Sequence, residues 1–463
     1  MNSSIETAWL PDLIYVEGRL RSNEALLSDR GGNVLEVTTP TETSQVTRLK
    51  NHALFPGLVN AHSHGFQRVI RGRTEYRSGN STDSFWTWRE MMYHAATLFS
   101  PDDIYDASRM AFLEMAVSGI TAVGEFHYLH NGPDGTPYSD PNLMAKQVIR
   151  AARDVGLRIA LLRVAYGRAG FETPSDPRQL RFIEESETYL KNLQALTAEV
   201  TDKNFVWTGV APHSVRAVPL QYLKEIVHFA NQREMPVHMH VAEQPAEINS
   251  CIAEYGRSPI ALLETEGLLS NRFTAVHAIH ITEKAARTLG QAQAMVCACP
   301  TTERNLGDGV VPASILIAEG VPISLGTDSQ IQIDLLEDAR ELEYHLRLKQ
   351  LERVVSADND DSKSSLASRL FTCATVNGAI SIGSTSGALA QGTPADFFTV
   401  DLNDASIAGA STEDLLPNVV FSLSRTAVRD VVVGGKTIVN DGRHSDQDEI
   451  VDRFRRLQAK LWH

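Results

Sequence analysis

Residues that could bind a metal ion end the most conspicuous apolar segment of the chain. His62 and His64 are spaced His-x-His within Leu54–Arg68, which reads LFPGLVNAHSHGFQR. Residues two apart on a β-strand point to the same side, so both imidazoles are expected to project together from the strand end. Two converging neutral imidazoles make half of a metal site, and zinc is the usual ion for such nitrogen ligands.

Further histidines and carboxylates stand at the ends of later strand-like segments. In chain order these are His127 with Tyr128, His213, His240 with Glu243, His277, and Asp328. His238 lies deeper in its segment than His240, which favours a core role for it. His280 is expected to lie beyond its strand, so His277 is the preferred candidate. One such histidine would carry little weight, but their joint placement at strand ends predicts one shared site.

Three histidines and an aspartate leave a catalytic zinc ion room for a water molecule. Zinc can lower the pKa of that water from about 15.7 towards about 7, which predicts hydrolysis at an electrophilic carbon. Asp328, beside the metal, could take the proton of the water. Glu243, three residues after His240, could pass a proton to a leaving nitrogen.

The elements that must position these residues are strands alternating with amphipathic helices. Eight nearly all-apolar segments qualify as strands, and they start at residues 54, 120, 158, 205, 236, 273, 294 and 322. Such strands imply a parallel sheet covered on both sides. Eight units predict an α/β fold, a (β/α)8 TIM-like barrel with its active site at the carboxyl ends of the strands. An open doubly wound sheet is the alternative, but no glycine-rich phosphate turn follows the first strand.

Both ends of the chain have a different texture, with short strand-like runs separated by turns. Residues 1–55 and 390–445 are therefore expected to form one small β-sandwich, antiparallel in its N-terminal part, with Gly434-Gly435 as a hairpin turn. The barrel would span 56–389, and 446–463 would form a C-terminal helix. The excursion from Arg73 to Tyr93, which contains FWTWRE, is expected to cover the barrel mouth.

Composition limits the possible partners. The formal net charge of -14 argues against nucleic acid and against an anionic membrane surface. Four cysteines are too few for a disulfide framework in 463 residues, and no secretory signal or membrane-spanning run is visible. We expect a soluble, cytoplasmic protein whose partner is a small molecule.

Several of these motifs resemble the amidohydrolase superfamily: HSH, HVAE, VHAIH and LGTDS at the ends of strands one, five, six and eight. PGLVNAHSH and QGTPADFFTVDL look like its junctions between barrel and β-domain. HVAE, without an evident bridging lysine on strand four, resembles the one-metal branch. The resemblance implies one Zn²⁺ per subunit, bound by His62, His64, His240 and Asp328. It also implies that Glu243 and His277 act as proton shuttle and water-orienting partner, and that the protein is a homodimer.

The remaining polar residues near the predicted site bear on the substrate. They are Gln67, Arg89, Tyr128, His213 and Arg216. Arginine binds carboxylates bidentately, so this set suits a small anionic molecule better than a neutral purine. HSHGFQR, SFWTWRE, GEFHYLH, APHSVRAV and CPTTERNLGDG resemble the formiminoglutamate deiminase branch, in which the matching residues hold the glutamate portion. The resemblance implies hydrolysis of N-formimino-L-glutamate, an amino-acid derivative of histidine degradation, to N-formyl-L-glutamate and ammonia.

Two other functions stay open at this stage. A related aminohydrolase acting on a guanine-like, cytosine-like or triazine ring would need aromatic and amide groups where this chain has arginines. A metal-free barrel retained as a scaffold would have lost at least one ligand, and the sequence keeps all of them. The ligand types alone do not separate zinc from iron or manganese.

Overall fold

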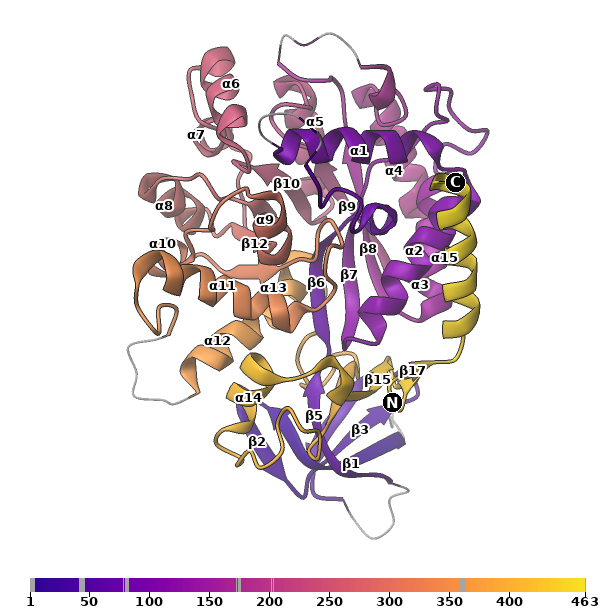
Figure 1. Ribbon diagram of the computed structural model, residues 1–463, viewed down its shortest axis with the longest axis vertical. Coiled ribbons are helices and arrows are strands. Elements are labelled where there is room, and N and C mark those ends of the chain that lie inside the picture. Colours follow the sequence, from indigo (N-terminus) through magenta and orange to yellow (C-terminus); the bar gives the residue numbers. More distant parts are fainter. Residues whose placement is uncertain are drawn as a thin grey trace.

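The computed structural model describes residues 5–40, 46–77, 79, 83–171, 173, 176–200, 202, 204–357 and 364–462. It contains an eight-stranded parallel barrel above a second sheet built from the two ends of the chain (Figure 1). The predicted fold class is therefore confirmed. No helix in these ranges is long and apolar enough to cross a membrane.

The barrel strands follow one another around the sheet in chain order. They are β6 (Leu58–Ser63), β7 (Ile120–His127), β8 (Arg158–Ala165), β9 (Val206–Pro212), β10 (Val237–Val241), β11 (Phe273–His277), β12 (Met295–Ala298) and β13 (Ile323–Leu325). All eight lie within the predicted segments. Nearly every residue in them is buried, as expected for strands covered by helices outside and packed side chains inside.

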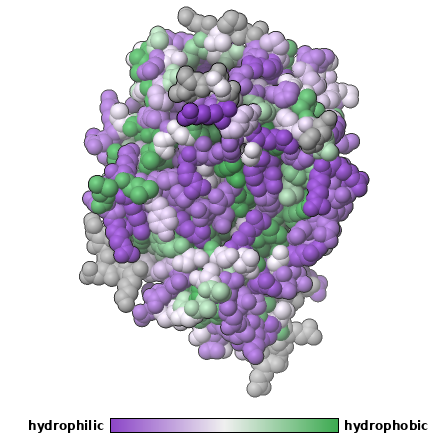
Figure 2. Space-filling view, viewed as in Figure 1, coloured by the Kyte–Doolittle hydropathy of each residue, from purple (hydrophilic) through white to green (hydrophobic). Residues whose placement is uncertain are grey.

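Helices connect the strands and form the outer layer (Figure 1). They are η1 (Gly65–Ile70), α1 (Phe85–Leu98), α2 (Pro101–Ala116), α3 (Leu143–Val155), η2 (Pro177–Gln179), α4 (Ser186–Glu199), α5 (Leu220–Gln232), α6 (Pro245–Tyr255), α7 (Pro259–Thr265), α8 (Glu283–Gln291), α9 (Pro300–Leu306), α10 (Ala313–Ala318), α11 (Leu335–Gln350), α12 (Ser365–Ala374) and α13 (Val376–Ser381). On the face seen in Figure 2, hydrophilic residues cover most of this layer, with smaller hydrophobic areas between them.

The terminal sheet contains nine strands from both ends of the chain. They are β1 (Ile5–Val16), β2 (Arg19–Ser22), β3 (Ala25–Asp29), β4 (Val34–Thr38), β5 (Thr47–Pro56), β14 (Phe397–Asp401), β15 (Val428–Val433), β16 (Lys436–Asn440) and β17 (Arg443–His444). The short α14 (Leu415–Ser422) and η3 (Arg425–Ala427) lie between β14 and β15.

The terminal sheet bends over its own apolar face and forms the predicted β-sandwich. The Ala395 N–H donates to the carbonyl oxygen of Gly32 at 2.8 Å, which brings the β3–β4 turn onto the start of β14. Inside, the rings of Trp9 and Phe397 meet edge to face with centroids 5.0 Å apart. The expectation that the N-terminal part is antiparallel was wrong for one pair of strands, because β1 pairs with β5 in parallel. The chain passes through β2, β3 and β4 between these two strands, so β5 returns in the direction of β1.

The two sheets meet where β5 gives way to β6. The Leu54–His64 segment is not one strand, since it breaks at Gly57, where an added Cβ would lie 2.1 Å from Thr121 Oγ1. Arg158 at the start of β8 binds the carboxylate of Asp396 through Nε at 2.7 Å and NH2 at 3.1 Å. This buried bidentate pair ties the barrel to the sandwich at the end opposite the predicted site.

The last helix, α15 (Gln447–Trp462), runs along α2 (Figure 1). Lys460 binds the carboxylate of Asp103, with Nζ 2.6 Å from Oδ2. Gln458 Nε2 donates to the carbonyl oxygen of Val69 in η1 at 3.0 Å. The helix therefore supports the segment that directly follows His62 and His64.

Candidate metal centre and active site

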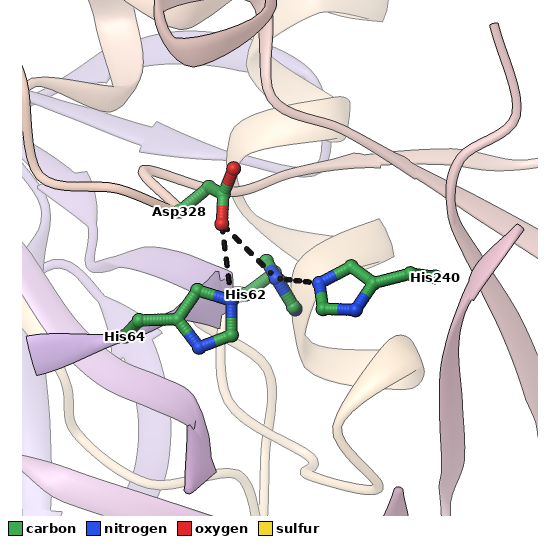
Figure 3. A group of neighbouring side chains, drawn as sticks. All are labelled: His62, His64, His240 and Asp328. Carbon is green, nitrogen blue, oxygen red and sulfur yellow. Dashed lines mark hydrogen bonds and ion pairs between the residues drawn. The ribbon is translucent and has the colours of Figure 1, made fainter. Parts of the chain in front are cut away.

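Four buried side chains from three strand ends point toward one another at the barrel mouth (Figure 3). Asp328 Oδ1 lies 3.3 Å from His62 Nε2 and 3.2 Å from His64 Nε2. His240 Nε2 lies 3.2 Å from His62 Nε2. One ligand atom from each residue falls within 4.8 Å of all the others. These are the four residues predicted as metal ligands.

Hydrogen bonds behind two of the rings turn their Nε2 atoms toward this centre. His64 Nδ1 donates to the carbonyl oxygen of Phe126 at 2.9 Å, and His240 Nδ1 donates to that of His213 at 3.1 Å. Each Nε2 then carries a lone pair facing its neighbours. Such backing bonds are the usual way in which proteins orient metal-binding histidines.

A buried polar network holds the strand ends that carry these ligands. Gln330 Nε2 donates to Ser63 Oγ and to the carbonyl oxygen of Asp328, both at 2.9 Å. Ser63 Oγ and the Gly65 N–H each donate to the carboxylate of Glu125 at 2.6 Å. Burial raises the pKa of Glu125 to about 7. Ser63 and Gly65, on either side of His64, are thereby both held in place.

Two site residues have backbone conformations that non-glycine residues seldom adopt. The φ angle is 45° at Asp328 and 70° at His277, both in the left-handed region. At Asp328 the chain is held by hydrogen bonds to the neighbouring strand end, from the Asp328 N–H to His62 O and from the His64 N–H to Asp328 O, each 3.0 Å. Strain of this kind persists where the surrounding structure fixes it, and it is typical of functional sites.

Gly326 leaves the space that His62 needs. A Cβ at this position would lie 2.7 Å from His62 Cβ and 3.1 Å from Cys299 Sγ. No side chain can be accommodated at these separations without displacing the histidine or the strand behind it.

The charge states of the four residues suit a divalent cation. Burial lowers the pKa of His62 to about 3, so its imidazole is neutral near pH 7. Burial alone would raise the pKa of Asp328, but the adjoining imidazoles of His62 and His64 hold it well below its ordinary value. Neutral imidazoles around a buried carboxylate are the donor set of catalytic zinc sites. The residues present therefore fit a metal ion.

Glu243 and His277 lie beside this cluster. His277 Nε2 is 3.7 Å from Glu243 Oε1 and 3.9 Å from Asp328 Oδ2. Burial raises the pKa of Glu243 above its ordinary value. The alternative histidine His280 instead binds the carbonyl oxygen of Asp308 at 2.9 Å. His238 likewise points away from the cluster and binds the carbonyl oxygen of Ser381 at 2.8 Å.

All five predicted substrate-binding residues line one cavity together with His64, His240 and Asp328 of the metal cluster. They are Gln67, Arg89, Tyr128, His213 and Arg216. Gln67 Nε2 donates to the Tyr128 hydroxyl at 3.0 Å, and the Arg89 guanidinium lies 4.4 Å from the ring centroid of Trp86. Helix α1, from the FWTWRE excursion, lies across the mouth and supplies Arg89 (Figure 1).

Several buried polar atoms in this cavity have hydrogen-bonding capacity to spare. Within the described part of the chain, nothing accepts a hydrogen bond from Arg89 Nε or Arg216 NH1, and nothing donates to Gln67 Oε1. Buried polar groups are nearly always paired, so these N–H groups could still donate to a further acceptor.

The sequence pattern of the amidohydrolase family matches residues 53–438, which is most of the chain. The protein belongs to the amidohydrolase family. It is thus a hydrolase that acts on carbon–nitrogen bonds, with a buried cluster that could hold the metal ion of that family. Among curated relatives, this amidohydrolase is 36% identical to the formimidoylglutamate deiminase of Pseudomonas aeruginosa, over 98% of both chains. It is 25% identical to a 5-methylthioadenosine/S-adenosylhomocysteine deaminase of Syntrophomonas wolfei, over 89% of this chain and 88% of the relative.

Solved structures show the same architecture. The crystal structure of an amidohydrolase from Brucella melitensis superposes with a TM-score of 0.91 and 32% identity, over 99% of this chain and all of the other. A zinc-bound adenosine deaminase from Xanthomonas campestris gives a TM-score of 0.82 at 22% identity, over 99% of this chain and 98% of the other, and shows the shared fold alone.

Some residues of this amidohydrolase site were not predicted from the sequence. Tyr93 lines the cavity, and Gln179 Nε2 in η2 donates to its hydroxyl at 2.7 Å. Glu303 contacts His277, and Asp308 Oδ1 accepts a hydrogen bond from Gln244, the neighbour of Glu243, at 2.5 Å. The signal available was CPTTERNLGDG, which contains both carboxylates but served only as a family motif.

Proposed function

We propose that this amidohydrolase is a zinc-dependent deiminase that hydrolyses N-formimino-L-glutamate to N-formyl-L-glutamate and ammonia. One observation supports this substrate above others. Arg89 and Arg216 line the cavity of the metal cluster with N–H groups that no described residue accepts. A substrate carboxylate in this position would pair both guanidinium groups through charge-assisted hydrogen bonds.

The relative from Pseudomonas aeruginosa supports the same choice, since it is a formimidoylglutamate deiminase and similar along nearly its whole length. The methylthioadenosine-type deaminases are more distant, at 25% identity for the one from Syntrophomonas wolfei. Of the two substrates in their names, 5-methylthioadenosine carries no carboxylate for the two buried arginines, and S-adenosylhomocysteine carries a single one, remote from the adenine ring. Deamination of an aminated ring is therefore the second candidate.

The residues divide the chemistry between them. His62, His64, His240 and Asp328 would hold zinc, which when bound makes a water molecule acidic enough to act as a nucleophile near neutral pH. Asp328 accepts a proton from the attacking water. His277 orients this water through Nε2, which lies 3.9 Å from Asp328 Oδ2. The water oxygen bonds to the formimino carbon and becomes the oxygen of the formyl group.

Glu243 completes the reaction at the nitrogen. Burial raises the pKa of its carboxyl group, which favours the protonated form that this role requires. Glu243 gives that proton to the formimino nitrogen as the water adds, and the proton taken up by Asp328 then passes to the same nitrogen. The carbon–nitrogen bond breaks, ammonia departs, and the remaining proton of the added hydroxyl group returns to Glu243. Arg89, Arg216 and the Gln67–Tyr128 pair hold the glutamate portion during these steps, which keeps the reacting carbon at the metal centre.

The test is ammonia release from N-formimino-L-glutamate by zinc-loaded protein. Arg216→Ala is compared with Arg272→Ala, which removes an arginine that pairs with Glu234 at the protein surface. We expect turnover by the wild type, a loss of about 100-fold in kcat/KM for Arg216→Ala, and little change for Arg272→Ala. Activity on an aminated ring without activity on N-formimino-L-glutamate would refute the substrate and favour the second candidate.

A further inference from the structure

We infer that Glu303 is a positioning residue for His277, which it holds with Nδ1–H on its own carboxylate and Nε2 toward the reaction centre. The inference rests on the proposed function in so far as His277 serves the reaction. It adds a residue that the predicted site did not contain.

The contact is direct and buried. Glu303 Oε1 is 3.2 Å from His277 Nδ1, and both residues are about 1% exposed. On the opposite side of the ring, Nε2 faces Glu243 Oε1 at 3.7 Å and Asp328 Oδ2 at 3.9 Å. A carboxylate can only accept, so the proton of a neutral His277 ring stays on Nδ1, and Nε2 offers its lone pair to the centre.

His277 needs such support because its backbone does not position it by itself. The residue ends β11 in the left-handed region, at a φ of 70°, and Ala278 follows at 49°. The regular alternation of side chains along a strand stops at this point, so the ring orientation depends on its contacts. The ring of His240 stacks on that of His277 with centroids 5.5 Å apart, a contact that leaves the in-plane orientation of the imidazole free.

Glu303 also has a simpler possible role at the start of α9. Its Oε1 accepts a hydrogen bond from the Cys299 N–H at 2.8 Å, as a capping carboxylate does at a helix N-terminus. Asp338 binds the same helix turn, since its Oδ1 accepts from the Thr301 N–H at 3.0 Å. Asp338 therefore supplies a matched control, a buried carboxylate on the same turn that supports the helix from another side.

The experiment compares Glu303→Ala, Glu303→Gln and Asp338→Asn in the metal-loaded protein. Loss of the residue that supports a functional histidine from behind typically lowers metal affinity or activity by about 10-fold to 100-fold. We expect kcat to fall about 100-fold in Glu303→Ala. Glu303→Gln keeps an acceptor without the charge, so we expect about a 10-fold fall. KM and metal content should stay at the wild-type values in both, and kcat should stay within about twofold in Asp338→Asn.

A spectroscopic readout makes the test independent of turnover. In protein labelled with ¹⁵N-histidine, the ring signals of His277 are those lost in His277→Ala. We expect a protonated Nδ1 in the wild type and Asp338→Asn, and a shift toward protonated Nε2 in Glu303→Ala.

Three results would overturn the inference: wild-type kcat in Glu303→Gln, an unchanged tautomer in a folded Glu303→Ala, or equal losses in the Glu303 and Asp338 variants. Should Glu303→Ala not fold, Glu303→Gln decides. The kcat of each variant relative to the wild type is measured on whichever substrate the wild type hydrolyses. A wrong substrate assignment would therefore appear in the wild type and leave the comparison of variants intact.

Discussion

Ser63 and Asp328 face each other as an isolated parallel bridge at the seam of the barrel, where the first strand, β6, meets the last, β13. The residues beside Ser63 are His62 and His64, and both exchange backbone hydrogen bonds with Asp328 at 3.0 Å. The same residues bring their side chains together in the cluster that could hold a metal ion. Closure of the barrel and assembly of the metal centre are thus one structural event.

Removal of the metal should destabilise the barrel. A ligand present at 100 times its Kd stabilises a folded protein by about 2.7 kcal/mol. We expect a chelator to lower the Tm of the zinc-loaded protein. Asp328→Asn should carry less metal and show a smaller chelator effect, because it lacks the carboxylate shared by His62 and His64. Thermal scans with metal analysis test this, and identical scans with and without chelator would contradict it.

Glu243→Gln should abolish proton delivery while leaving the metal centre intact. General acid–base groups contribute about 10²-fold to 10⁴-fold, so kcat should fall within that range. Metal content should not change, since Glu243 lies outside the cluster of ligands. The control is Glu254→Gln, which alters a glutamate of α6 that pairs with Arg168 away from the centre. Parallel loss of zinc in Glu243→Gln would show that the residue acts on the metal instead.

Gly326→Ala should harm both stability and metal binding. The added methyl would lie 2.7 Å from His62 Cβ and 2.8 Å from His62 O, so the strand end must move. Overpacking of this kind costs about 1–3 kcal/mol. Denaturant unfolding and zinc titration measure the two effects. A variant with wild-type stability and zinc affinity would show that the seam can expand without cost.

Stability at acid pH should depend on Glu184. This buried carboxylate binds both terminal nitrogens of Arg163, with NH2 3.0 Å from Oε1. Burial opposes its ionisation, but the charges of His130 and Arg163 lower its pKa from the ordinary 4.5 to about 2. Because the folded pKa is the lower one, the contribution is complete above the ordinary value and is lost as the pH falls from about 4.5 towards about 2.

The size of that contribution follows from the shift. Each pKa unit corresponds to about 1.4 kcal/mol, so the contribution is on the order of 3 kcal/mol. Glu184→Gln should be less stable at pH 7 and should lose less Tm than the wild type between pH 5 and pH 3. Parallel Tm curves for the two proteins would refute a role for this carboxylate in the acid response.

The sequence predicted the strand-borne part of the site because strand geometry is regular. His62 and His64 share a face through the period of two, and His240 and Asp328 end strands that a parallel barrel must bring to the same mouth. Arg89 was predicted from its place in the aromatic segment FWTWRE after the first strand. This segment forms the start of α1, the helix across the mouth.

The supporting contacts could not be predicted, because they join elements whose relative placement the local pattern does not encode. Glu125 is a lone charge in an apolar strand, and nothing nearby in sequence indicates Ser63 and Gly65 as its partners. Glu303 looks like a helix-capping residue until α9 is seen packed against His277. The parallel pairing of β1 with β5 was missed for the same reason.

The seam also determines how the protein should open. Asn60 and Thr327, 267 positions apart in the chain, are joined by a buried hydrogen bond of 2.7 Å. Contacts across so long a loop form only after most chain entropy has been lost, so we expect this junction to close late in folding. A metal ion bound across it would act as a cross-link between the first and last strands. In the metal-free protein, the amide hydrogens of Asp328 and His64 should exchange with solvent before those inside the central strands.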